Sequence, residues 1–229
     1  KLKVHTTKAA SAVITASYGP VVQNVTVTVA DGRFWYSLGN GLGNGLDNNW
    51  YLDGNNASVV SSDGNKTTVQ MGSGYRGDLW LARSGKGKIV NVTPADYRYF
   101  AIKVGFKSQL VPGKNKPNGC IKLEIFDDGI KKIGPEYFGT GGDANNRYEI
   151  LGASEISTTE PNVLYYDLQS KYKTVTPTDW NQVFDLSQCK FVIADFPETA
   201  QTYDLYWIRS FKSIEELQAF VDSENNTNE

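Results

Sequence analysis

Apolar and polar residues alternate with a period of two along much of this chain. The clearest case is Val25–Val29, where valine and threonine alternate before Asp31-Gly32, a pair typical of tight hairpin turns, and then Arg33–Leu38. Successive side chains of a strand point to opposite faces, so this alternation indicates strands with one buried face. The pattern therefore predicts a β-hairpin that turns at Asp31-Gly32.

Similar segments recur down the chain, separated by turns rich in Gly, Asn, Asp and Pro. In Tyr97–Phe106 the residues Phe100, Ile102 and Val104 share one side. Many short strands without intervening helices predict an all-β antiparallel sandwich. The other predicted strands are Ala57–Ser61, Thr67–Met71 after an Asp63-Gly64 turn, Leu79–Ala82, Ile89–Val92, Cys120–Phe126, Asn162–Asp167, Lys190–Asp195 and Tyr203–Phe211.

The strand Tyr203–Phe211 carries a tryptophan, which we interpret as structural. Unbroken alternation would place Leu205, Trp207 and Arg209 on one face, and Tyr206 with Ile208 on the other. Trp35 and Tyr36 also alternate, so one of these two rings should enter the core.

One helix is predicted, near the C-terminus. Ser213 and Glu216 form a capping box, and an apolar stripe at helical spacing follows through Phe220. We expect a helix over 213–222 and a frayed tail over 223–229. We interpret residues 1–229 as a single β-sandwich domain. Residues 1–20 would be either its first strand, which we favour, or a remnant of an upstream module.

Composition restricts the class of protein. The 229 residues are 40% hydrophobic and 12% aromatic, enough for a packed core, and the net charge of −2 argues against nucleic acid as a partner. The segment from Arg83 to Lys122 contains nine basic residues and a single acid, Asp96. These basic residues indicate either a solvated surface or a groove for an acidic glycan. No apolar run is long enough for a transmembrane segment, and we expect a secreted or cell-surface protein, a monomer, whose signal or anchor is absent from this sequence.

Several chemistries are excluded by residue counts. His5 is the only histidine, which excludes Ser-His-Asp and Cys-His catalysis and the usual zinc sites. Cys120 and Cys189 can be bridged or free. Among the carboxylates, Asp127-Asp128-Gly129 reads as a turn and Glu124 as a strand residue, so no catalytic pair stands out.

Calcium is the one metal that the chain could hold in loops. Asp47–Asn49, Asp53–Asn56 and Asp143–Asn146 supply oxygen ligands, although we favour their interpretation as turn-forming Asp and Asn residues. Two long segments, Gly39–Asn49 and Gly134–Asn146, are too irregular for simple hairpin turns, and such loops in compact domains are usually functional or mobile.

Aromatic residues set in turn sequences suggest a binding surface. Gly74–Trp80 places a ring and a planar guanidinium in a glycine-bounded turn, and a flexible segment precedes Trp50. Loops run over the surface, so rings there can cover the apolar face of a pyranose while amides and guanidinium groups bind its hydroxyls. The predicted ligand-binding residues are Trp50, Tyr51, Tyr75, Arg76, Trp80 and Trp180.

Three segments carry a resemblance to a known group. Tyr97–Lys103, Val163–Leu168 and Tyr206–Phe211, followed by the Ser-x-x-Glu helix, resemble domains of surface and secreted glycan-utilisation proteins of gut Bacteroidetes. Those domains are similar to galactose-binding-like carbohydrate-binding modules. The resemblance spans about Gly32 to Ser223, implies a jelly-roll β-sandwich and a glycan partner, and identifies no binding residue.

The sequence thus predicts a non-catalytic carbohydrate-binding domain. Two alternatives stay open. A jelly-roll glycoside hydrolase or lyase would use a pair of carboxylates, and a structural or interaction module would bury its aromatic residues in the core.

Overall fold

The computed structural model describes most of the chain. The described residues are 10–29, 33–43, 50–52, 57–71, 76–83, 86–87, 90–92, 96–107, 120–127, 132–133, 149–167, 184–194 and 201–226.

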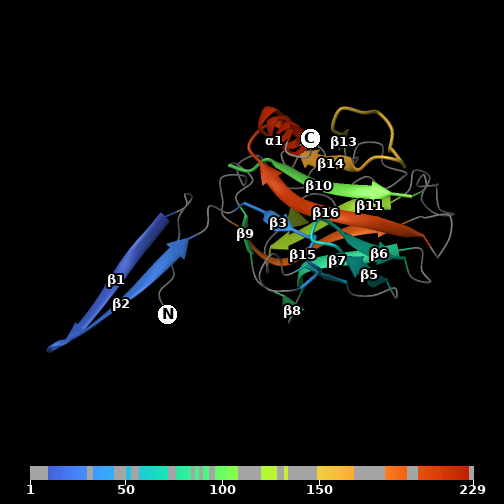
Figure 1. Cartoon of the computed structure of the whole chain (residues 1–229). Coiled ribbons are helices and arrows are strands. Elements are labelled where there is room, and N and C mark those ends of the chain that lie inside the picture. The colour runs from blue at the N-terminus through green and yellow to red at the C-terminus, as the bar shows by residue number, and fades with distance from the viewer. Residues whose placement is uncertain are drawn as a thin grey trace.

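Two seven-stranded antiparallel sheets form a sandwich (Figure 1). This confirms the predicted all-β sandwich. The first, which we call the front sheet, has the order β13-β14-β10-β16-β6-β5, with β3 also beside β16. Its strands are β3 Trp35–Ser37, β5 Ser58–Ser62, β6 Thr67–Gln70, β10 Tyr99–Phe106, β13 Glu149–Ile150, β14 Asn162–Asp167 and β16 Thr202–Phe211.

The second, which we call the back sheet, has the order β12-β11-β15-β7-β4, with β8 beside β7 and β9 beside β15. Its strands are β4 Tyr51–Leu52, β7 Arg76–Arg83, β8 Lys86–Gly87, β9 Val90–Val92, β11 Cys120–Asp127, β12 Lys132–Ile133 and β15 Phe184–Ala194.

The N-terminal strands form a separate hairpin. β1 (Ala10–Tyr18) pairs with β2 (Val21–Val29) in a two-stranded sheet of their own, which projects away from the sandwich (Figure 1). The turn lies at Gly19-Pro20, where Gly19 adopts a φ of 57° that few other residues tolerate. The expected hairpin between Val25–Val29 and Arg33–Leu38 is therefore wrong, because β2 pairs with β1 and β3 pairs with β16. Within the described residues, β1 does not supply a first strand of the sandwich.

The main core lies between the two sheets. Phe100, Ile102 and Val104 of β10 are fully buried in it, as their alternation predicts. From the back sheet, Leu79 joins the same cluster. Burial of such side chains stabilises by about 1.5–3 kcal/mol each, so this layer supplies most of the cohesion between the sheets.

A β-bulge divides β16. In its pairing with β10, Lys103 lies opposite Trp207 and Val104 lies opposite Leu205, so Tyr206 is an extra residue. Leu205 consequently belongs to the main core, whereas Trp207 belongs to a second cluster on the outer face. The prediction that Leu205 and Trp207 share a face is wrong, because the bulge reverses the alternation between them.

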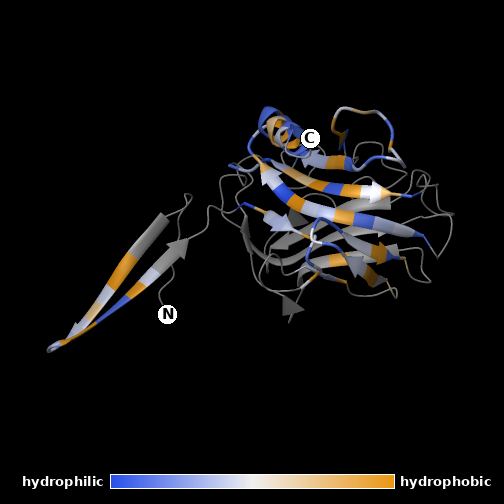
Figure 2. Cartoon of the chain, viewed as in Figure 1, coloured by the Kyte–Doolittle hydropathy of each residue, from blue (hydrophilic) through white to orange (hydrophobic). Residues whose placement is uncertain are grey.

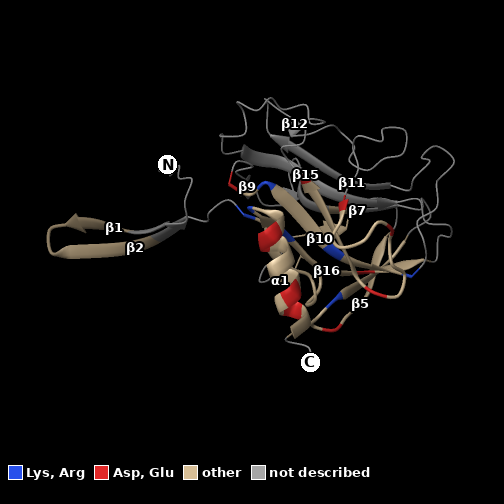
Figure 3. Cartoon of the chain, turned by 90° about the horizontal axis from the view of Figure 1, so that it is seen from above, with Lys and Arg blue, Asp and Glu red and all other residues tan. Residues whose placement is uncertain are grey.

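The helix α1 (Ile214–Asn226) covers part of the outer face of the front sheet (Figure 3). Its N-terminus is capped as predicted: the Glu216 amide donates to Ser213 Oγ at 3.2 Å. Its apolar side, centred on the fully buried Leu217, packs against Trp207 and Phe211, and Figure 2 shows these hydrophobic positions on the helix. The helix continues to Asn226, four residues past the predicted end, so the expected frayed tail from 223 is wrong.

The two cysteines are offset along neighbouring strands. Cys120 lies opposite Ala194, and Cys189 lies opposite Ile125, so five residues of strand separate the two positions. At about 3.3 Å per residue this offset is roughly 17 Å, whereas a disulfide needs Cα atoms within about 7 Å. In this register Cys120 and Cys189 cannot bridge each other.

Candidate functional site

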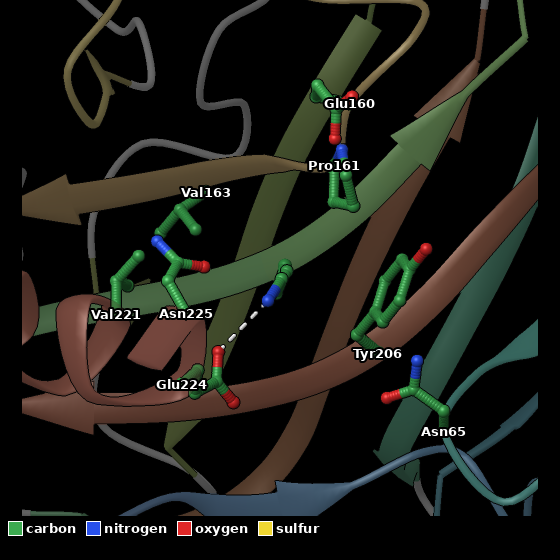
Figure 4. Close-up of a pocket in the computed structure, with 9 residues that line it drawn as sticks. Asn65, Glu160, Pro161, Val163, Tyr206, Val221, Glu224 and Asn225 are labelled. Atoms are coloured by element: carbon green, nitrogen blue, oxygen red, sulfur yellow. Dashed lines mark hydrogen bonds and ion pairs between the residues drawn. The ribbon is translucent and has the colours of Figure 1, made fainter. Parts of the chain in front are cut away.

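An open hollow of about 650 Å³ lies on the outer face of the front sheet, beside the C-terminal end of α1 (Figure 4). Three strands or their adjoining loops, one turn and the helix contribute to it, so residues far apart in the sequence meet there. Its lining consists of Asn65, Lys103, Glu160, Pro161, Val163, Tyr206, Val221, Glu224 and Asn225.

The bulge in β16 gives the hollow its aromatic residue. Because Tyr206 is the extra residue of the bulge, it lies on the outer face next to Trp207. The Lys103 ammonium lies 5.5 Å from the centre of the Tyr206 ring. Burial raises the pKa of the Tyr206 phenol. Its hydroxyl, protonated at neutral pH like any phenol, can donate a hydrogen bond.

Glu224 is the polar centre of the hollow. Its Oε2 accepts from Lys103 Nζ at 3.0 Å and from the Trp207 indole Nε1 at 3.1 Å, and Figure 4 shows the first of these contacts. Arg209 Nη1 lies 3.8 Å from the other oxygen, Oε1. The cations and the indole hold this carboxylate in one orientation, at the edge where the helix meets the sheet.

Arg209 lies behind Glu224 among aromatic rings. Its guanidinium is 4.4 Å from the ring centres of both Trp35 and Phe220. Burial lowers the pKa of Arg209, although Glu224 opposes this effect. Trp35 therefore packs at the helix edge, with 41% of its surface exposed, while Tyr36 packs against the main core. This confirms that one of the two rings enters the core.

The wall formed by Glu160 and Pro161 is fixed by Asn162. The Asn162 side chain accepts from the Ser157 amide at 2.7 Å and donates to the Ser157 carbonyl at 2.8 Å. Ser157 Oγ in turn accepts from the Glu160 amide at 3.0 Å. Asn162 is only 4% exposed, so its hydrogen bonds anchor this loop to the sandwich and help to position Glu160.

The opposite wall is the turn between β5 and β6. Asp63 Oδ1 accepts from the amides of Asn65 and Lys66 at 2.9 and 2.8 Å, which closes an Asx turn and confirms the turn predicted at Asp63-Gly64. These two bonds lower the pKa of Asp63. Gly39 packs so closely under the turn that the Gly64 amide donates to its carbonyl at 3.0 Å.

An ionic cluster around the buried Asp204 supports this turn. Asp204 Oδ2 accepts from Lys66 at 2.8 Å and from Lys107 at 2.9 Å, and Thr68 donates to Oδ1 at 2.7 Å. Burial alone would raise the pKa of Asp204, but these hydrogen bonds outweigh it and lower the pKa. The cluster fixes Lys66, the residue next to Asn65, and so holds the wall in place.

Trp50 does not face solvent. Its side chain has no exposed surface and packs in the main core, with its ring 6.0 Å from that of Tyr36 at an angle of 85°. The prediction that Trp50 contacts a ligand is wrong for this structure, because the indole lies fully buried in the main core.

Of the other predicted ligand-binding residues, only Tyr51 has a described side chain, and it does not line the hollow. Tyr51 is half-buried on β4 and lies opposite Trp80 of β7. Arg76 and Trp80 lie in β7, but their side chains, together with Tyr75 and Trp180, lie outside the described residues. The predicted calcium-binding segments also lie outside them. Within the described part, no three His, Cys, Asp or Glu side chains gather as a metal site, and no helix there is long and apolar enough to cross a membrane.

Sequence reasoning missed every residue of the hollow. Tyr206 was hidden by a bulge that period-two alternation cannot reveal. Glu224 had a usable signal, since it follows Val221 at helical spacing and would lie on the helix if the helix were extended by one turn. Lys103 carried no signal beyond its place in the predicted strand Tyr97–Phe106, on the side opposite the apolar residues.

The chain matches a family model but no curated protein. A family model described as "Domain of unknown function (DUF4979)" matches residues 41–217, more than half of the chain and most of the sandwich. The chain therefore belongs to the DUF4979 family.

Proposed function

We propose that this protein is a non-catalytic glycan-binding module and that the hollow beside α1 is its binding site. The observation that carries the proposal is the position of Tyr206. Its ring lies in an open hollow beside hydrogen-bonding groups that come from separate elements, including Asn65 and Glu224. Concave sites with an aromatic surface and a few convergent polar groups are the usual form of small-molecule sites.

The groups in the hollow suit a pyranose. The Tyr206 ring offers an apolar surface for the C–H face of the sugar, and its phenol can donate to a hydroxyl. A carboxylate such as Glu224 has several acceptor positions for hydroxyl hydrogens, and the amides of Asn65 and Asn225 can both donate and accept.

The charges of the hollow favour a neutral glycan. Lys103 carries a positive charge and Glu160 and Glu224 carry negative charges, with Arg209 behind Glu224 as a second cation. The cations are engaged with the carboxylate and leave no cationic surplus for a sulfate or uronate. A single shallow site of this kind is expected to bind weakly, with a Kd on the order of 10⁻⁴ to 10⁻³ M, about −4 to −5.5 kcal/mol. Binding of this kind suits a secreted or cell-surface protein.

The first test is retention on immobilised neutral polysaccharides, preceded by a glycan array to choose them. Tyr206→Ala removes the ring and should reduce affinity at least tenfold, about 1.4 kcal/mol. The control is Val60→Ala on β5, where Val60 is 56% exposed and does not line the hollow. Equal retention of both variants would remove Tyr206 from the site.

The same samples separate binding from hydrolysis. Glu160 and Glu224 both line the hollow, and a glycosidase would need two carboxylates flanking the bond that it cleaves. We expect bound oligosaccharide to be recovered intact after prolonged incubation. Release of shortened products that stops with Glu160→Gln would establish the enzyme instead.

A further inference from the structure

The hairpin of β1 and β2 has the composition of an association surface. Residues 10–29 contain no Asp, Glu, Lys or Arg. Within the described chain, both strands pair only with each other, so each keeps one open edge. Natural proteins usually protect open edges with charges, bulges or short strands, and this nine-residue ladder has an uninterrupted register.

The hairpin also exposes apolar side chains on both strands. In the register of the ladder, Ile14 lies opposite Val25 and Tyr18 lies opposite Val21 on the same face. Ile14 is 39% exposed, and the other three side chains are more than half exposed, Tyr18 the most at 90%. Figure 2 shows the hydrophobic positions along the hairpin. An isolated two-stranded hairpin is marginally stable in water, whereas three or more strands with an apolar face can be stable.

We propose that β1 pairs antiparallel with β1 of a second copy of this chain and forms a four-stranded sheet across a two-fold axis. The register that places the axis at Ile14 sets Ile14 opposite Ile14 and Val13 opposite Thr15. It also sets Tyr18, the largest residue of the strand, opposite Ala10. In this register each residue lies opposite a residue whose side chain points to the same side of the sheet. The apolar face therefore continues across the interface.

The absence of charge selects a second copy over a charged partner. An uncharged surface offers no attraction to an acidic or basic protein, but two identical uncharged edges meet without repulsion. Two-fold association of one patch with itself is also the commonest symmetry of soluble oligomers. β1 is the better edge of the two, because its centre, Val13-Ile14-Thr15, is β-branched throughout, whereas β2 carries Gln23 and Asn24 near its centre. The proposed dimer differs from the monomer expected from the sequence.

Light scattering on the full chain tests the dimer. The unmodified protein, at concentrations up to about 100 µM, should show about twice the chain mass of 25.3 kDa. Ile14→Lys places two ammonium groups opposite each other at the axis and should return the mass to that of one chain. The matched control is Val60→Lys on β5, another exposed strand valine at 56% exposure, which should stay dimeric.

A mass of one chain for the unmodified protein would overturn the proposal. So would dissociation by Val60→Lys with no effect of Ile14→Lys, because the interface would then lie on the sandwich.

Cysteine cross-linking tests the register. Directly opposite residues of antiparallel strands have Cβ atoms about 4.5–5.5 Å apart, close enough for a disulfide after small adjustments. Ile14→Cys should therefore give a reducible covalent dimer under mild oxidation, and Val60→Cys should not. Equal cross-linking of the two variants would contradict the two-fold axis at Ile14. Near-ultraviolet circular dichroism of the variants shows whether the sandwich stays folded.

Discussion

At the residue scale, Asp204 shows how a carboxylate with 2% of its side chain exposed is kept ionised. Lys66 and Lys107 neutralise it, and Thr68 donates a third hydrogen bond. Both lysines are partly exposed, at 31% and 51%, so solvent screens the attraction. The cluster links the β5–β6 turn to β16. It thereby connects Asn65 and Tyr206, which line the hollow from these two elements.

This cluster predicts a loss of stability in acid. Because the folded pKa of Asp204 is lowered, its stabilisation is complete above the ordinary carboxylate pKa and is lost as pH falls through the folded value. Asp204→Asn should lower the free energy of unfolding by about 1–2 kcal/mol at pH 7. The difference from the unmodified protein should shrink below about pH 4. Urea unfolding from pH 7 to pH 3 measures it, and parallel pH curves for the two proteins would contradict the assignment.

The residues of the site show where pattern reasoning fails. Trp50 follows a glycine- and asparagine-rich segment, which suggested an exposed ring, yet it is fully buried. Local sequence reports the chance of a turn, but whether the next side chain points in or out depends on contacts with a sheet that is distant in sequence. Tyr206 is the converse case, because one extra residue in β16 turned it to the outer face.

At the element scale, the turn that presents Asn65 depends on a glycine from another segment. A Cβ added to Gly39 would lie 2.2 Å from the Gly64 carbonyl oxygen and 2.7 Å from the Asn65 carbonyl carbon. Both are backbone atoms, so the turn itself would have to move. The site wall and the fold are therefore coupled at Gly39.

Gly39→Ala should consequently lower the free energy of unfolding by about 1–3 kcal/mol and weaken glycan retention. The control is Gly105→Ala, where the new Cβ would meet no atom closer than the Asp204 Cβ at 3.4 Å, an ordinary contact. Denaturant midpoints of the two variants give the comparison. If Gly39→Ala unfolds no earlier than Gly105→Ala, the turn is not held by this close approach.

Individual elements were largely predictable because their signals are local. The boundaries of β14 coincide with the predicted strand Asn162–Asp167, and the Ser213 cap of α1 was readable from two residues. Which strands pair with each other was harder to predict from the sequence. Val25–Val29 was assigned to a hairpin with Arg33–Leu38, but it pairs with β1, since the Gly19-Pro20 turn competes for the same strand.

At the scale of the whole molecule, the sandwich and the C-terminal helix meet at the hollow. The sandwich supplies Tyr206 and Lys103, α1 supplies Glu224, and the hairpin stays apart (Figure 1). The family match covers residues 41–217, so both the hairpin and Glu224 lie outside it. Glycan recognition that uses Glu224 would thus depend on a residue beyond the matched family region.

The most direct measurement of the proposed site is an NMR titration that follows indole N–H signals. The Trp207 indole donates to Glu224 at 3.1 Å, so a sugar hydroxyl bound to Glu224 must change its chemical shift. Trp50, fully buried in the main core, serves as the internal reference. Replacement of each by Phe assigns the two signals.

We predict a saturable shift of the Trp207 signal on addition of a neutral oligosaccharide that the glycan array identifies, with the Trp50 signal unchanged. Saturable binding of that oligosaccharide with the Trp207 signal unmoved would contradict the account and place the glycan elsewhere on the molecule.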